Sequence, residues 1–234
     1  MAVLRARADR TTRRLLAAGL ASGPVFLGSW AGQALTRDGF EPSRHPLSLL
    51  SLGEHGWVQI ASFVVTGGLA AAGGWGIRRC LSTGPGRTWG PLLVGGYGLG
   101  LVLAGIFVTD PGAGFPAGAP EGAPESMSWH GILHEVGFVT AMLSWTAAAA
   151  VLGTRFLRLR DVPWATAFLA SALAAPTLAL WPADPATFVP RTMVATTWQF
   201  ALLAALAVRL LRRLPGAQDV ASEPAPALRQ AQGA

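Results

Sequence analysis

The sequence contains no lysine, a single cysteine, a single tyrosine and few charged residues of any kind. Only 13% of its 234 residues are charged, whereas 51% are hydrophobic and the mean hydropathy is +0.42. Soluble domains carry about 25% charged residues, so this composition excludes an ordinary soluble protein. The lone cysteine, Cys80, excludes an internal disulfide framework. The composition therefore predicts a membrane protein.

The chain does have long apolar stretches. A helix needs about 20 predominantly apolar residues to cross the hydrocarbon core, and a helix satisfies its own backbone polar groups there. Six stretches qualify: Leu15–Leu35, Trp57–Ile77, Pro91–Val108, Trp129–Gly153, Pro163–Trp181 and Thr192–Leu211. They predict an all-α bundle of six transmembrane helices over residues 15–211. An arginine-rich N-terminus (1–14) would precede this domain, and a low-complexity tail (212–234), expected to be disordered, would follow it.

The arginines are unevenly distributed between the two sides of this predicted bundle. All 18 basic residues are arginine, and all but Arg37, Arg44 and Arg191 fall before the first stretch, after the second or fourth, or at the end of the sixth and beyond it. Positive charge is retained in the cytoplasm during insertion, so we expect a multi-pass protein of the cell membrane with both termini cytoplasmic. The same pattern accounts for the net charge of +6. We therefore expect the lipid bilayer, and no nucleic acid, as the partner of these charges.

The arginine pair that precedes the first stretch also fits an export signal. Arg13 and Arg14 stand directly before the apolar residues, as in twin-arginine leaders. Removal of that stretch would leave five helices and break the alternation of arginine-rich and arginine-poor loops. We therefore expect the first stretch to remain as a transmembrane helix.

Three stretches end in an aspartate with a proline close behind. Asp110 lies 72 positions after Asp38, and Asp184 lies 74 positions after Asp110. This nearly constant spacing predicts three helical hairpins that descend from one repeat. Helix termination explains both residue types, because proline cannot continue a helix and aspartate favours turns. Membership of a shared polar site is the alternative interpretation of the aspartates.

Small residues recur every fourth position on two of the predicted helices. In lipid, small residues allow helix backbones to approach closely. We therefore expect the second and third helices to make the closest contact, through the two rows Gly68, Ala72, Gly76 and Gly96, Gly100, Ala104.

Histidines and acidic residues, which could bind a ligand or take part in catalysis, lie mostly on the side opposite the arginine-rich loops. All four histidines lie there, as do most of the 12 acidic residues. Glu135 would lie about 9 Å below Trp129 along its helix, and an ionisable residue within the membrane is a functional candidate. We predict an outward-facing polar pocket formed by Arg44, His45, Asp110, His130, His134, Glu135, Asp184 and Arg191.

Two of these histidines also suggest a metal site. His130 and His134 lie one turn apart on a helix face. That spacing can bind a divalent metal such as zinc, with Asp110 or Asp184 as a third ligand. Hydrogen bonds from each histidine to nearby loops are the alternative interpretation. No other cofactor is predicted.

Three segments resemble the signature segments of a known family. They are RHPLSLLSLGEHGWVQIASFVVTGG (Arg44–Gly68), GYGLGLVLAGIFVTDPGAGFP (Gly96–Pro116) and WHGILHEVGF (Trp129–Phe138). Together they resemble domain of unknown function 998, a family of bacterial and archaeal integral membrane proteins. The resemblance extends roughly from the first stretch to the sixth. It implies a six-helix fold and carries no established activity.

Three functional hypotheses follow, since the chain has no nucleophile motif, phosphate loop or redox signature. The favoured one is a binding or accessory protein whose pocket holds a lipid headgroup or other small ligand, so an enzyme is not favoured. The second is a small-solute or ion transporter, although the cytoplasmic halves of the stretches offer almost no ionisable residue to continue a path. The third is an outer-face metal-dependent hydrolase with Glu135 as general base. The loop Gly112–Ser128 is expected to be a mobile lid or a plain spacer.

Overall fold

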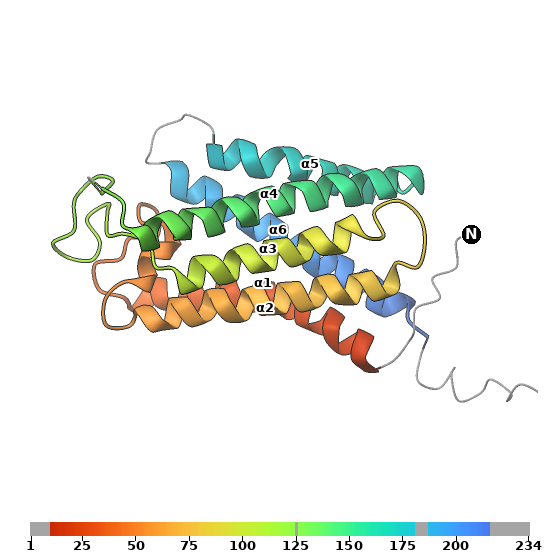
Figure 1. Ribbon diagram of the computed structural model, residues 1–234, viewed down its shortest axis with the longest axis horizontal. Helices are drawn as coiled ribbons and strands as arrows, with labels where there is room; N and C mark the ends of the chain where they lie inside the picture. Colours follow the sequence, from red (N-terminus) through yellow and green to blue (C-terminus); the bar gives the residue numbers. More distant parts are fainter. Residues whose placement is uncertain (1–9, 125, 181–186, 216–234) are drawn as a thin grey trace, which may run out of the picture.

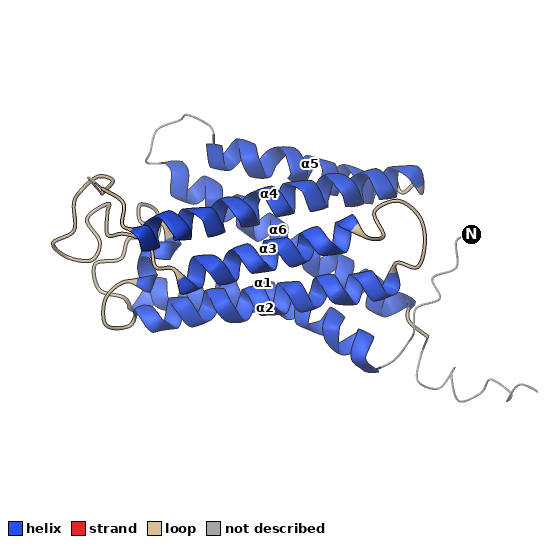
Figure 2. Ribbon diagram, viewed as in Figure 1, coloured by secondary structure: helices blue, strands red, loops and turns tan. Residues whose placement is uncertain are grey.

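The computed structural model describes residues 10–124, 126–180 and 187–215. Within these ranges the chain forms helices and loops and no strand (Figure 2). The elements are α1 (Arg10–Thr36), the short 3₁₀ helix η1 (Leu47–Ser51), α2 (Gly56–Cys80), α3 (Trp89–Ile106), α4 (Trp129–Arg158), α5 (Val162–Leu180) and α6 (Phe188–Arg213). The predicted all-α fold with six long helices is confirmed. Each predicted stretch coincides with one helix, because apolar length determined both.

The helices have the length and the apolar surface of membrane-spanning segments. Five of them, α1, α2, α3, α4 and α6, are long and apolar enough to cross a membrane, while the apolar described part of α5, Val162–Leu178, is shorter. Large apolar side chains also point outward around the bundle, among them Val65, Leu99, Leu143, Leu173 and Val194. Such a surface is unfavourable in water. The chain therefore has the architecture of a multi-pass integral membrane protein.

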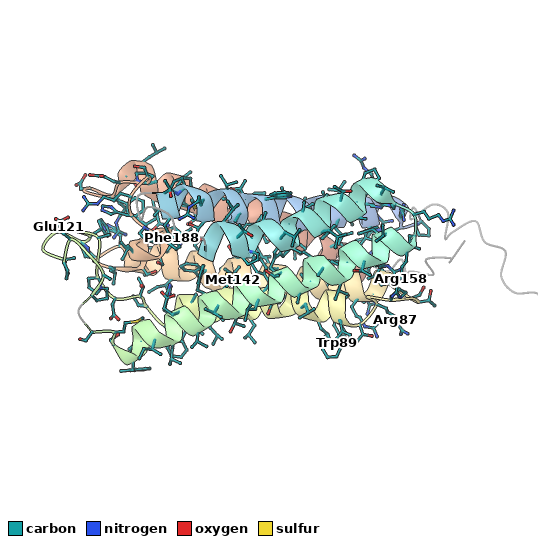
Figure 3. All side chains as sticks on the ribbon, turned by 90° about the horizontal axis from the view of Figure 1, so that it is seen from above. Arg87, Trp89, Glu121, Met142, Arg158 and Phe188 are labelled. Atoms are coloured by element: carbon teal, nitrogen blue, oxygen red, sulfur yellow. The ribbon has the colours of Figure 1, made fainter. Side chains whose placement is uncertain are left out.

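The six helices form a closed ring. Each helix packs against the next one in the chain, and α6 packs against α1 (Figure 1). Loops 37–55 and 107–128 lie together at one end, here called the long-loop end. The loops 81–88 and 159–161 lie at the other, here called the arginine end. Figure 3 shows Glu121 at the long-loop end and Arg87 and Arg158 at the arginine end.

The closest approach of α2 and α3 uses glycines other than the predicted ones. A Cβ built on Gly67 of α2 would lie 2.4 Å from the carbonyl oxygen of Gly98 on α3, and the reverse distance is also 2.4 Å. No atom lies within 4 Å of a Cβ built on the neighbouring Gly68. Gly76, also in the predicted row, faces the backbone of α1 at Leu16. The predicted pairing of the two rows was therefore wrong.

The predicted row on α3 does make a close contact, but with α4. A Cβ on Gly100 would lie 2.4 Å from the backbone nitrogen of Ala141. A Cβ on Gly137 of α4 would in turn lie 2.6 Å from the nitrogen of Ala104. A four-residue spacing identifies a face along which backbones can approach. It does not specify which neighbouring helix that face meets.

An aromatic layer closes the middle of the bundle. Its rings are at most 5% exposed and belong to five helices: Phe26, Phe63, Tyr97, Trp145 and Phe200. Neighbouring ring centroids are 5.3–5.8 Å apart, which is the range in which aromatic pairs attract. The indole of Trp145 adds the remaining helix, because its Nε1 donates to Ser171 Oγ of α5 at 3.0 Å. All six helices thus meet at this layer.

Candidate functional site

A cavity of about 820 Å³ lies between the aromatic layer and the long loops. Its wall comes from α1, α2, α3, α4, α5 and α6 together with both long loops, and Phe26, Phe63 and Tyr97 of the aromatic layer line its deep end. The volume is within the range of small-molecule sites in proteins. Figure 3 shows Met142 of α4 and Phe188 of α6, two of its lining residues, in the half of the bundle toward the long-loop end.

The two long loops fold together into a cap over this cavity. Phe115 of the second loop is only 3% exposed and packs in a small core with Phe40, Leu49 and Leu50 of the first loop. This packing differs from the expected mobile lid or spacer, because one buried aromatic residue ties the glycine-rich loop to its neighbour. We call loops 37–55 and 107–128 together the cap.

His45 joins the two loops of the cap and does not line the cavity. Its Nδ1 accepts a hydrogen bond from the backbone nitrogen of Glu41 at 2.9 Å, and its Nε2 lies 3.0 Å from the carbonyl oxygen of Ala113. A carbonyl only accepts, so Nε2 carries the hydrogen. The ring also packs against Phe40 and Phe115. His45 therefore holds the cap together.

The corner between α3 and α4 is closed by two reciprocal contacts, and both involve predicted site residues. Asp110, just after α3, accepts a hydrogen bond at Oδ2 from the backbone nitrogen of Ser128 at the start of α4. His134 of α4 places Nδ1 at 2.8 Å and 3.0 Å from the carbonyl oxygens of Ala104 and Phe107 at the end of α3. Helix ends leave such groups without partners. A residue next to or within each helix thus provides a hydrogen-bond partner for backbone groups at the end of the other helix.

Charged residues line the cavity near the cap. Arg44 forms an ion pair with Glu121 across the two loops, and both residues line the cavity. Arg191, near the start of α6, also lines it, and its Nε donates to the carbonyl oxygen of Thr187 at 3.0 Å. Glu135 lines the cavity, but its side chain is exposed, so it lies at the opening of the cavity and is not buried in the interior as the sequence suggested. We call these residues, with Asp110, the charged rim.

Some of the residues predicted to form the pocket line this cavity, and others do not. Arg44, Asp110, His134, Glu135 and Arg191 line one cavity. His130 does not, because its exposed ring lies against Trp129, with 3.6 Å between ring centroids. Asp184 lies outside the described residues.

The metal site stays a prediction, and the geometry adds no support to it. His134 and Asp110 each direct a polar atom at backbone groups of the α3–α4 corner, while His130 lies on Trp129. Among the described residues, no group of three or more His, Cys, Asp and Glu side chains could hold a metal ion.

A polar stripe on α6, defined as Thr192, Thr196 and Gln199, also belongs to the cavity wall and was not predicted from the sequence. All three line the cavity and recur at helical spacing on one face. Gln199 is only 8% exposed, and its amide forms no hydrogen bond with the described part of the protein. The available signal was a row of polar residues at spacings of four and three inside an apolar stretch, which marks an inward-facing helix surface in a membrane.

A comparison with protein families finds a match over most of the chain. The family described as Protein of unknown function (DUF998) matches residues 20–211. No curated protein and no solved structure matched the chain. The matched residues contain the cap, the cavity wall and the aromatic layer, and they make up most of the chain. The protein is therefore a member of the DUF998 family.

Proposed function

We propose that this protein is a membrane-embedded binding protein that holds an amphipathic small molecule, such as a lipid, in the cavity beneath the cap. One observation carries the proposal, namely that a single cavity combines a charged rim with an apolar interior. The interior wall includes Phe26, Phe63, Leu101, Phe138 and Met142. An amphipathic ligand would place apolar parts against these residues and polar parts elsewhere, as ligand sites in proteins commonly require.

We further propose that the cap faces the outside of the cell membrane. The arginine end would then lie in the cytoplasm with both termini, as the retention of positive charge requires. Residues 1–14 and 212–234 would flank the membrane domain on that side. The descent of the three hairpins α1–α2, α3–α4 and α5–α6 from one repeat also remains part of this proposal.

The aromatic layer favours binding over transport. A solute crossing from the cavity to the arginine end would have to pass Phe26, Tyr97 and Phe200, whose rings pack against one another. The hydrolase hypothesis would use Glu135 beside a metal at His130 and His134, and those two histidines do not converge. Neither alternative has an observation of its own in its favour.

The test measures the binding of defined amphiphiles to the detergent-purified protein. Native mass spectrometry counts the molecules bound to each chain. The probes are 1-palmitoylglycerol and palmitoyl lysophosphatidylcholine, and we expect at least one of them to bind at one molecule per chain. Ala195→Phe, at a buried position in the cavity wall, should weaken binding at least about tenfold, a change of 1.4 kcal/mol. Ala201→Phe, on the exposed face of the same helix, is the matched control and should bind normally.

A second cavity-filling variant guards against a folding defect in the first. Met142→Trp fills the cavity from α4 rather than from α6. The proposal fails if neither probe binds, or if both filling variants fold, as judged by circular dichroism, and still bind like the original protein.

A further inference from the structure

We infer that the cavity receives a neutral headgroup that carries a free hydroxyl, held by His134 of α4 and Gln199 of α6. This inference rests on the proposed function, because it names the class of ligand that would enter the cavity. The class comprises neutral lipids with a hydroxyl donor, whether a glycerol hydroxyl of an acylglycerol or a ring hydroxyl of a quinol.

The hydrogen bonds of His134 determine what its free nitrogen can do. Nδ1 lies within hydrogen-bond distance of two carbonyl oxygens, those of Ala104 and Phe107. Carbonyl oxygens only accept, so Nδ1 carries the hydrogen, and the neutral ring then leaves Nε2 as an acceptor. His134 is only 4% exposed and lines the cavity, and its Nε2 has no partner among the described residues. The matching group on a ligand is therefore a hydrogen-bond donor.

Gln199 supplies a second unsatisfied polar group at the same cavity. Its side chain is 8% exposed and lines the cavity, and its amide makes no hydrogen bond within the described residues, so the amide atoms face the cavity space. It lies about 16 Å along α6 from Phe188, deep in the bundle. A buried amide without a partner is unfavourable in an apolar environment. A hydroxyl can both donate and accept a hydrogen bond. A headgroup with a hydroxyl can therefore pair with either the carbonyl oxygen or the NH₂ group of the Gln199 amide.

The charges around the cavity indicate that this headgroup is neutral. Among the described lining residues, the charged ones belong to the charged rim, in the cap or in the first two turns of α4 and α6. His134 adjoins Glu135 of this rim in the second turn of α4, with its ring centroid 6.2 Å from that of Phe63, whereas Gln199 lies deeper, about three turns into α6. A phosphate or ammonium group at the depth of Gln199 would lose its hydration without a charged lining residue of the described chain beside it. A hydroxyl does not incur that cost.

The experiment compares probes that differ only in the hydroxyl. The first pair is 1-palmitoylglycerol and its 2,3-di-O-methyl ether, and the second is a decyl benzoquinol and its dimethyl ether. We expect the protein to bind the hydroxyl form of at least one pair about tenfold more tightly than the ether, as expected for one or two hydrogen bonds. A preference in the first pair identifies an acylglycerol, and a preference in the second identifies a quinol.

Two variants test the assigned residues. His134→Asn keeps an amide nitrogen at the position of Nδ1 and removes Nε2, so the α3–α4 corner retains its donor. Gln199→Leu removes the amide at nearly constant volume. Each should lower the preference for the hydroxyl form about fivefold and leave ether binding within about twofold. Thr197→Val, on the exposed face of α6, is the matched control and should change neither.

The outcomes separate this inference from the proposed function. Equal binding of hydroxyl and ether probes, with both lost in Ala195→Phe, would overturn the hydroxyl assignment and leave the binding function standing. A hydroxyl preference that survives in both His134→Asn and Gln199→Leu would overturn the assignment to these residues. Failure of every probe to bind would overturn the proposed function itself.

Discussion

His45 and His134 show how a buried histidine can serve the backbone before it serves a ligand. Each uses ring nitrogens on main-chain groups that have no partner in regular structure, in the cap for His45 and at the end of α3 for His134. Buried backbone groups are nearly always paired in folded proteins. His45 is fully engaged, with both ring nitrogens in hydrogen bonds, whereas His134 retains one nitrogen for the cavity. The same residue type therefore has two different roles at one end of the molecule.

Replacement of His45 should loosen the cap. His45→Ala removes two hydrogen bonds and the ring between Phe40 and Phe115, so we expect a loss of about 2–3 kcal/mol in the free energy of unfolding in detergent. Hydrogen exchange of residues 112–124 should become faster, because Ala113 loses its partner. His55→Ala, at an exposed position in the same loop, should change neither quantity. Unchanged exchange in His45→Ala would contradict the assigned role.

Asp110 and Gly131 should show strong coupling. A Cβ on Gly131 would lie 2.0 Å from Oδ2 of Asp110, and its three nearest heavy atoms all belong to that carboxylate group. Gly131→Ala alone should therefore destabilise the protein by about 1–3 kcal/mol. Asp110→Ala should cost about 1–2 kcal/mol through the lost contact with the start of α4.

The double variant separates the clash from the lost hydrogen bond. Asp110→Ala with Gly131→Ala should be more stable than the sum of the two single changes predicts, by about 1 kcal/mol or more, because the clash disappears with the carboxylate. Thermal unfolding of all four proteins in detergent measures this difference. Additive effects would show that the carboxylate does not lie against Gly131.

At a few glycines, neighbouring helices in the ring approach each other closely enough for their backbones to be in contact. Gly67 and Gly98 allow α2 and α3 to touch, Gly100 and Gly137 do the same for α3 and α4, and Gly73 approaches Gly19 of α1. Lipid offers little hydrophobic force between helices, so close van der Waals contact supplies much of the association. Each of these pairs thus determines which two helices are neighbours.

Adjacent glycines on α2 provide a direct test of this packing. Gly67→Ala places a methyl group 2.4 Å from the carbonyl oxygen of Gly98, so the two helices must separate, at a cost of about 2 kcal/mol or more. Gly68→Ala faces open space and should be neutral or slightly stabilising. Melting temperatures of the two variants in the same detergent distinguish them. Equal values would show that α2 and α3 do not meet at Gly67.

The described part of the molecule has a cavity in one half of its helix bundle only. The cap and the charged rim lie at one end, the aromatic layer closes the cavity from within, and the arginine end lies beyond that layer. In the proposed topology, the uneven distribution of arginines places the arginine end in the cytoplasm. In that topology, the cap and the charged rim face the outside of the membrane.

Cysteine labelling in intact cells tests the orientation. With Cys80 replaced by serine, a cysteine introduced at Ala117 in the cap should react with an impermeant maleimide. A cysteine at Thr88, in the loop before α3, should react only after the membrane is opened. Both positions are exposed, so accessibility of the side chain is matched. Reaction at Thr88 but not at Ala117 in intact cells would reverse the proposed topology.

The number, type and approximate limits of the helices could be read from apolar length alone, because each helix must be apolar over the thickness of a bilayer whatever its neighbours are. The concentration of histidines and acids near one end could also be predicted, since it depends only on chain order. Contacts between helices could not be predicted in this way. Gly68 and Gly67 look equivalent in the sequence, and only the crossing of α2 and α3 makes one of them essential.

Contacts between helices also decide which of the predicted site residues line the cavity. His130 and His134 stand one turn apart, yet one lies on an exposed tryptophan and the other between two carbonyls of α3. Gln199 stands far from both in the chain and reaches the cavity because α6 closes the ring against α1. Local sequence specifies what a helix is made of and roughly where it ends. Long-range packing determines which of its faces is buried, and therefore which polar groups remain available for a ligand.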